Sequence, residues 1–115
     1  MKQFGEYTSR VALDRMVLCE CKKAIKNIDN SVDIILYGSR ARGDAQSESD
    51  YDLLIITDGE ATVEREDILR RQLFPIELET GYVLTVFLIS RKDWNSPLYA
   101  AMPLYQNIKK DGILL

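Results

Sequence analysis

Residues 34–56 read IILYGSRARGDAQSESDYDLLII, and this stretch holds the most informative pattern of the chain. A short apolar run leads into Gly38-Ser39, ten residues follow, and an Asp-Tyr-Asp triplet then opens a second apolar run. Because side chains alternate between the two faces of a strand, we expect Asp50 and Asp52 to point the same way. The pattern therefore places a glycine-serine turn and a pair of acids beside each other, at the ends of two buried strands.

The residue types of this pattern predict a site for a nucleoside triphosphate and a metal ion. Two neighbouring carboxylates repel each other, and a hard divalent cation such as Mg²⁺ is the usual reason to keep both ionised. The Gly38-Ser39 turn offers backbone N–H groups and a hydroxyl to an anion. We therefore expect Asp50 and Asp52 to bind Mg²⁺ and Gly38 and Ser39 to hold the phosphates of ATP or a related triphosphate.

The segment GSRARGDAQSESDYD resembles the signature of the polymerase-β-like nucleotidyltransferase superfamily, and it is most similar to the minimal nucleotidyltransferase branch. The resemblance implies a single α/β domain over residues 1–115, with a short mixed β-sheet flanked by helices. It also implies that Gly38-Ser39 opens a short helix and helps to hold the triphosphate. Asp50 and Asp52 would then be the catalytic acids that bind Mg²⁺ for transfer of a nucleotidyl group to a protein or small acceptor.

The chain departs from the family pattern at the third carboxylate, which the family takes from a following strand. Here the corresponding residues 82–89 read YVLTVFLI and contain no acid. Alternation puts Val83, Thr85 and Phe87 on one face of that strand, and we expect the face with polar Thr85 to lie toward the site. Glu77 and Glu79 precede the strand, but neither is assigned as the missing ligand. The isolated chain is therefore predicted to be a poor catalyst.

Two classes of function follow from this departure. The chain is either a nucleotidyltransferase that modifies a protein or small acceptor, or a nucleotide-binding module with weak or no activity. The second class resembles antitoxin-like members of the family that pair with a helical HEPN-type protein. Either such a partner or a homo-oligomer is compatible with the sequence.

Arg40 and Arg42 follow the glycine-serine turn directly, within the short helix that the turn should open. Guanidinium groups suit phosphate oxygens, so we expect one of the two to contact phosphate. The alternative is that both form ion pairs with Asp44, Glu48 or solvent.

Composition sets further bounds. With 15 basic and 18 acidic residues the formal charge is −3, which argues against generic nucleic-acid binding. Cys19 and Cys21 match neither a zinc site nor a redox Cys-x-x-Cys, so we expect free thiols in a reducing cytoplasm. No apolar segment approaches the length needed to cross a bilayer, so no membrane association is expected.

Periodicity predicts the remaining elements. A helix over about 9–28 should bury an apolar stripe that consists of Leu13, Val17, Cys21, Ala24 and Ile28. Strands are expected at 33–37, 51–57 and 82–89. A second helix over 62–79 should be capped by Thr62 and kinked or ended by Pro75. Ser96-Pro97 should start a C-terminal helical region that Pro103 interrupts and Asp111-Gly112 stops.

Overall fold

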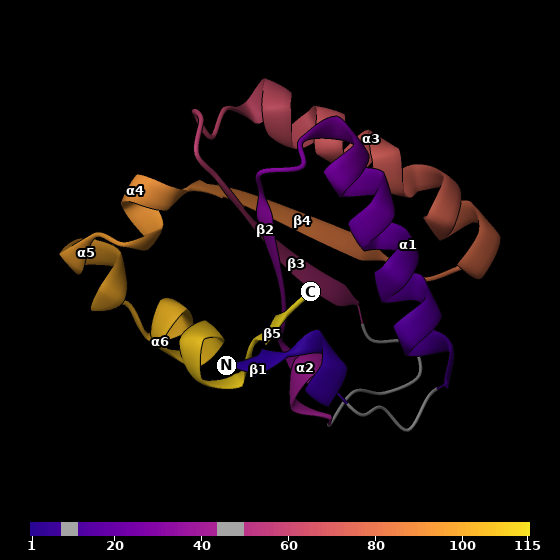
Figure 1. Ribbon diagram of the computed structural model, residues 1–115, viewed down its shortest axis with the longest axis horizontal. Helices are drawn as coiled ribbons and strands as arrows, with labels where there is room; N and C mark the ends of the chain where they lie inside the picture. The colour runs from indigo at the N-terminus through magenta and orange to yellow at the C-terminus, as the bar shows by residue number, and fades with distance from the viewer. Residues whose placement is uncertain (8–11, 44–49) are drawn as a thin grey trace.

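The structure, a computed structural model, describes residues 1–7, 12–43 and 50–115 (Figure 1). Asp44 and Glu48, the alternative ion-pair partners considered for the two arginines, lie outside the described residues, and so does the side chain of Leu13. The described part is an α/β fold with one five-stranded mixed sheet and helices on both of its faces. The predicted fold class is therefore confirmed.

The sheet has the strand order β1-β5-β2-β3-β4, and the two strands that flank the candidate site lie next to each other. Strand β2 pairs antiparallel with β3, and β3 pairs parallel with β4. The strands are β1 (Lys2–Gln3), β2 (Asp33–Tyr37), β3 (Tyr51–Thr57), β4 (Leu84–Ser90) and β5 (Ile113–Leu114). The predicted bounds of β2 and β3 are confirmed, whereas β4 begins two residues later than expected. Strands β1 and β5 were not predicted, because two residues carry no readable periodicity.

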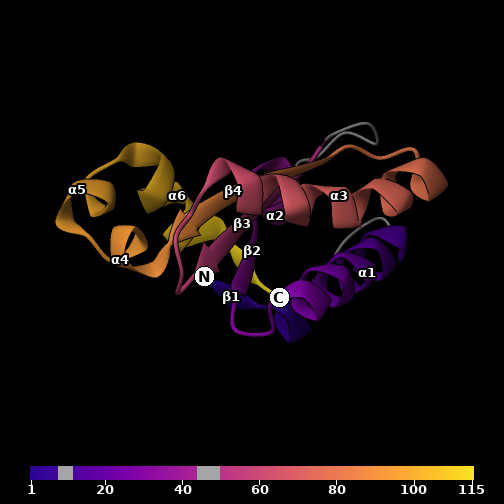
Figure 2. The ribbon, with the colours of Figure 1, turned by 90° about the horizontal axis from the view of Figure 1, so that it is seen from above.

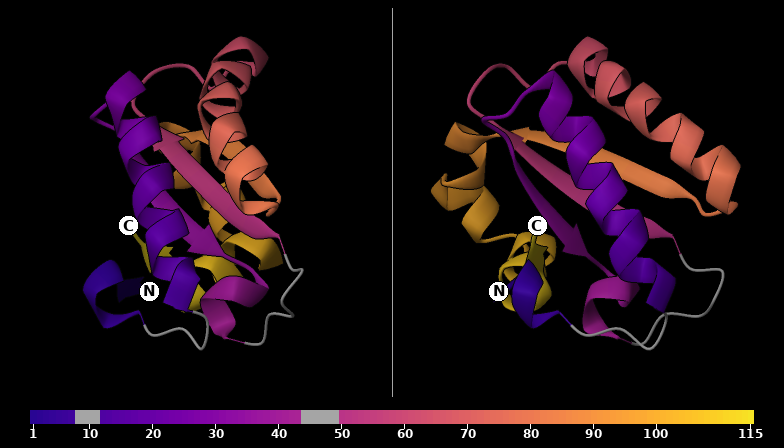
Figure 3. Two further views of the ribbon diagram at one scale, coloured as in Figure 1. Left: turned by 90° about the vertical axis from the view of Figure 1, so that its right-hand side faces the viewer. Right: turned by 45° about the vertical axis from the view of Figure 1, so that its right-hand side comes forward.

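Two long helices cover one face of the sheet, and the short C-terminal helices cover part of the other (Figures 1 and 3). Seen from above, the C-terminal helices gather at one end of the molecule, away from the two long helices (Figure 2). Among the described helices, none is both long and apolar enough to cross a bilayer. The helices are η1 (Phe4–Glu6), α1 (Ala12–Ile28), α2 (Ser39–Arg42), α3 (Val63–Thr80), α4 (Arg91–Trp94), α5 (Pro97–Ala100) and α6 (Pro103–Asp111).

Helix α1 buries a slightly different stripe from the one predicted. Val17 and Cys21 are buried as expected, together with Leu18 and Ile25. Ile28 is instead 46% exposed, because it is the last residue of the helix and the chain turns there toward β2. Burial raises the pKa of the Cys21 thiol to about 12, so this free cysteine is protonated and unreactive near neutral pH.

Helix α3 continues through Pro75 and ends at Thr80, so of the two predicted effects, a kink or an end of the helix, the second does not occur. Pro75 lies on the exposed side of the helix, where solvent can satisfy the carbonyl that the missing N–H leaves free. The start of the helix is as predicted, since the Thr62 hydroxyl accepts from the backbone N–H of Arg65 at 3.2 Å. In the C-terminal region, Pro97 begins α5 after Ser96, as predicted. Pro103 interrupts the helical region, as expected, and is itself the first residue of a new helix, α6.

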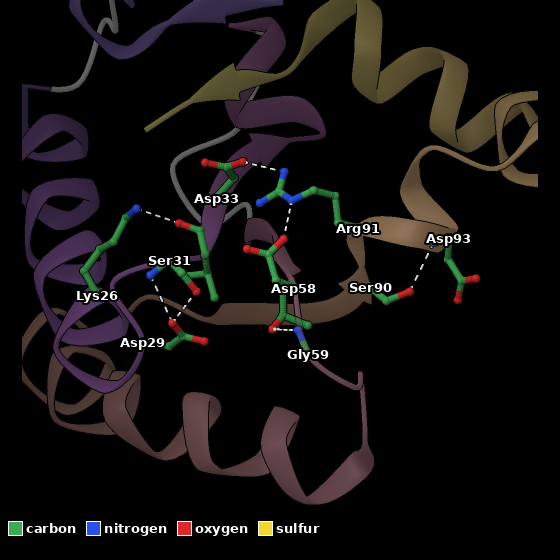
Figure 4. A network of polar contacts seen from close by, with 11 residues as sticks. Lys26, Asp29, Ser31, Asp33, Asp58, Gly59, Ser90, Arg91 and Asp93 are labelled. Atoms are coloured by element: carbon green, nitrogen blue, oxygen red, sulfur yellow. Dashed lines mark hydrogen bonds and ion pairs between the residues drawn. The ribbon is translucent and has the colours of Figure 1, made fainter.

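One arginine ties together the end of the sheet that lies away from the Gly-Ser turn. Arg91 donates to Asp33 at 2.8 Å and to Asp58 at 2.6 Å, as Figure 4 shows. These contacts join the start of β2, the turn after β3 and the start of α4. They connect the start of β2 to the end of β3, and the other ends of these two strands lie at the candidate site.

Strand β4 is an edge strand whose outward backbone groups are partnered by side chains from α3. Glu77 accepts from the N–H of Leu84 at 3.0 Å, and Glu66 accepts from the N–H of Leu88 at 3.1 Å. Arg70 reaches the carbonyl between them, that of Val86, at 3.4 Å. Unpartnered strand edges invite pairing with other chains. The side chains of α3 therefore protect this edge.

We predict that the double variant Glu66→Ala/Glu77→Ala loses about 1–3 kcal/mol of unfolding free energy and associates more readily as concentration rises. The reason is that two edge N–H groups lose their acceptors. Urea unfolding and sedimentation velocity measure the two effects. The matched control is Glu64→Ala/Glu79→Ala, which removes the same charge from exposed positions of the same helix. Equal behaviour of the two double variants would show that the acids do not protect β4.

Candidate functional site

Three strand ends meet at the candidate site. Strand β2 ends at Tyr37, which pairs with Asp52 near the start of β3. Asp52 in turn pairs with Thr85 near the start of β4. On the sheet face that packs against α6, Asp52, Thr85 and the half-exposed Phe87 lie beyond the residues that are buried under α6.

The Asp52 carboxylate lies directly against the backbone of Gly38. A Cβ placed on Gly38 would come within 2.5 Å of Asp52 Oδ2, closer than real carbon atoms approach. Gly38 also has a φ of 78° and a ψ of −158°, a conformation that is essentially restricted to glycine. The glycine is therefore required twice, for the turn that starts α2 and for the space that the carboxylate occupies.

Thr85 occupies the position opposite Asp52 on the neighbouring strand. Its hydroxyl donates to Asp52 Oδ1 at 2.6 Å, and it lies 3.3 Å from the backbone oxygen of Tyr51. The expectation that the Thr85 face of this strand lies toward the site is thus confirmed. A neutral hydroxyl stands at the position where the family resemblance implies a third acid.

The remaining predicted acids differ in their environment. Asp50 immediately precedes β3 and is exposed, whereas Asp52 is half-buried. Glu77 is engaged at the outer edge of β4, where it accepts from the N–H of Leu84, and Glu79 is exposed. In residues 1–7, 12–43 and 50–115 no group of three or more His, Cys, Asp or Glu side chains is arranged to hold a metal ion. Of these acids, Asp52 is the one whose described contacts place it against the Gly-Ser turn, and Asp50 lies two residues before it in the chain.

The two arginines of the turn point to different surroundings. Arg42 is exposed at the end of α2, beside the candidate site. Arg40 is only 2% exposed, and its guanidinium donates to Asp14 on α1 at 3.0 Å. A phosphate contact by Arg40 does not fit this placement, because its charge is already matched in the core. Of the two, Arg42 is the one whose side chain is exposed to solvent.

Tyr37 lies beside the acid on the same sheet face, and sequence reasoning missed it. Burial, with a smaller contribution from the Asp52 carboxylate, raises the pKa of Tyr37, so it remains a neutral phenol near neutral pH. Its position at the end of β2, directly before Gly38, was the available signal.

A shallow hollow of about 470 Å³ lies at the opposite end of β3 and β4 and is not part of this site. Its lining includes three acids, Asp58, Glu60 and Asp93, against one lysine, Lys92. Such a lining repels phosphate, so the hollow does not compete with the Gly-Ser turn as an anion site.

The comparison with known families agrees with this geometry. The family model for the nucleotidyltransferase domain matches residues 18–110, which include the turn, both acids and the following strand. The chain belongs to the nucleotidyltransferase domain family. No curated protein matches the chain.

Nucleotidyltransferase domains generally use divalent metal ions, and the donor set of this domain fits such an ion in part. Asp50 and Asp52 provide the oxygen ligands that a hard cation prefers, and Asp52 is held in place by Thr85. The threonine hydroxyl adds a neutral oxygen where a third carboxylate would add charge. The residues therefore suit a divalent ion that also binds phosphate oxygens.

We predict that Gly38→Ala destabilises this nucleotidyltransferase domain by about 1–3 kcal/mol, because alanine strains the backbone and meets the Asp52 carboxylate. Urea unfolding gives the loss. In an Asp52→Ala background the same substitution should cost less, since the carboxylate is absent. An identical cost in both backgrounds would mean that the contact between Gly38 and Asp52 does not contribute.

Proposed function

We propose that this domain binds a nucleoside triphosphate, with ATP favoured, together with Mg²⁺ between the Gly38-Ser39 turn and the acids Asp50 and Asp52. The observation that carries the proposal is the contact of the Asp52 carboxylate with the Gly38 backbone. The contact supports the proposal because it brings the predicted metal ligand Asp52 next to the turn that is predicted to hold phosphate. The exposed Arg42 lies near enough in sequence to assist phosphate binding.

The reaction that fits this site is transfer of a nucleotidyl group to a hydroxyl of a protein or small molecule. The acceptor oxygen forms a bond to the α-phosphorus, the bond to the bridging oxygen breaks, and pyrophosphate leaves. Mg²⁺, when bound, would neutralise charge on the triphosphate oxygens. The acceptor's proton must pass to a base, and the Thr85 hydroxyl is not a base near neutral pH. We therefore expect slow transfer by the domain alone.

A second candidate function is a nucleotide-binding module that acts through a partner. The hydrogen bond between Thr85 and Asp52, in place of a third acid, is the observation that favours it. In this reading the domain is an antitoxin-like partner of a helical HEPN-type protein, or it works as a homo-oligomer. For either candidate we propose a cytoplasmic location, which the free thiols Cys19 and Cys21 support.

The binding proposal predicts that Asp50→Asn/Asp52→Asn removes Mg²⁺-dependent affinity for ATP. Both substitutions preserve size and remove the charge that holds the cation. Titration calorimetry with and without Mg²⁺ measures the affinity, and circular dichroism checks the fold. Asp58→Asn/Asp93→Asn, at the opposite end of the sheet, is the control with the same loss of charge. Unchanged metal-dependent affinity in a folded Asp50/Asp52 variant would place the site elsewhere.

The transfer proposal predicts that Thr85→Asp raises turnover by roughly 10²-fold, the lower end of what a positioned base contributes. Pyrophosphate release from ATP measures transfer to any acceptor, water included. Thr85→Asn is the matched control, since it adds a side chain of the same size without a base, and it should give no gain.

The outcome also separates the two candidates. A gain with Thr85→Asp alone supports a transferase whose third acid is missing. If Thr85→Asp binds nucleotide but stays as slow as the unaltered domain, the binding module is the better description. Fast turnover by the unaltered domain would show that the missing base is supplied by a residue other than one at position 85.

A further inference from the structure

A buried charge cluster lies directly behind the candidate site and is not explained by ligand binding. The Arg40 guanidinium donates to Asp14 at 3.0 Å, and both side chains are almost completely buried. The guanidinium carbon also lies 4.3 Å from the ring centre of Tyr51 and 5.2 Å from that of Tyr82. The Tyr7 hydroxyl donates to the Arg40 carbonyl at 3.1 Å. One side chain therefore contacts α1, β3 and the segment that leads into β4.

Tyr51 connects this cluster to the segment that carries the two acids. It stands between Asp50 and Asp52 in sequence and is fully buried on the opposite face of β3. Its hydroxyl donates to the same Asp14 oxygen that Arg40 contacts. The phenol O–H is the donor of this hydrogen bond, and the Asp14 carboxylate is its acceptor. Asp14 thus links the helix of the phosphate turn to the strand of the acids.

Stability alone does not account for such a cluster. Desolvating two charges costs as much as their attraction returns, and apolar side chains of similar volume often replace a buried ion pair without loss. A guanidinium does offer fixed, planar donors and a face that stacks on aromatic rings. The particular contribution of the Arg40 guanidinium is therefore to fix the relative orientation of the segments that it contacts. These two segments are Gly38-Ser39-Arg40 and Asp50-Tyr51-Asp52.

We propose that Asp14, Arg40 and Tyr51 form a positioning unit that holds the phosphate turn at a set distance from the acid pair. Arg40 then acts through the backbone of the turn and does not itself touch phosphate. The assignment of the ligands rests on the proposed function, but the positioning of Gly38 relative to Asp52 does not.

The test replaces the unit by apolar side chains in the triple variant Asp14→Leu/Arg40→Met/Tyr51→Phe. Urea unfolding measures its stability, and titration with Mg²⁺–ATP measures its affinity. A ligand-free readout is the nuclear Overhauser effect between the Hα protons of Gly38 and the Hβ protons of Asp52. We expect a stability close to that of the unaltered domain, a weakened Gly38–Asp52 signal, and a loss of affinity of roughly 10–100-fold, as is typical for groups that orient metal ligands.

Tyr51→Phe is the second variant, and it decides the question if the triple variant does not fold. It removes only the hydroxyl that reaches Asp14. Its control is Ile25→Val, which removes one methylene from the fully buried core on the same helix as Asp14. We expect weaker Mg²⁺–ATP binding and a weaker Gly38–Asp52 signal in Tyr51→Phe, with both unchanged in Ile25→Val.

The result that overturns the proposal is a folded triple variant, or a folded Tyr51→Phe variant, with the Gly38–Asp52 signal of the unaltered domain. Equal losses of Mg²⁺–ATP affinity and of the Gly38–Asp52 signal in Tyr51→Phe and Ile25→Val would also overturn it. Such a result would mean that the three residues contribute only to the general stability of the domain. If the unaltered domain binds no nucleotide, the proposed function fails, and the ligand-free signal alone decides the positioning proposal.

Discussion

The buried positive charge of Arg40 is the constraint around which this end of the domain is arranged. A guanidinium in the core requires a carboxylate at hydrogen-bond distance, and Asp14 provides it from α1. Because Tyr51 donates to the same oxygen, the first long helix, the short helix α2 and strand β3 are joined at one point. The Gly-Ser turn is thereby attached to the core by the side chain that follows it, while its other surface faces the acids.

The parallel register of β3 and β4 is the second determinant of the site. It brings Thr85 opposite Asp52, so the chemistry at this position is decided by a residue 33 positions later in the chain. The carboxylate is consequently held between a hydroxyl on one side and the Gly38 backbone on the other. These two contacts set the position of the carboxylate in the structure.

The central strands and the position of Thr85 could be predicted from the sequence, because the patterns that determine them are local. The strands at 33–37 and 51–57 follow from mainly apolar runs that end at turn residues. The alternation of side chains along a strand correctly predicted that Thr85 lies toward the acid. The burial of Arg40 could not be predicted, since an arginine next to a glycine-serine turn suits a phosphate and an ion pair in the core equally well. Arg40 pairs in the core because α1 provides a buried acid, Asp14, one turn before Val17 and Leu18. An acid inside an apolar stripe was the signal available, and its partner is set by tertiary contacts.

The protected edge of β4 has a consequence for recognition. Strand addition is largely indifferent to sequence, because it relies on backbone groups that every residue carries. At β4 those groups are engaged by Glu66, Arg70 and Glu77, so a protein that approaches this side meets charged side chains of α3. Any complex formed there has to be selective for its partner's side chains, because the outward backbone groups of β4 are already hydrogen-bonded and cannot pair with another strand.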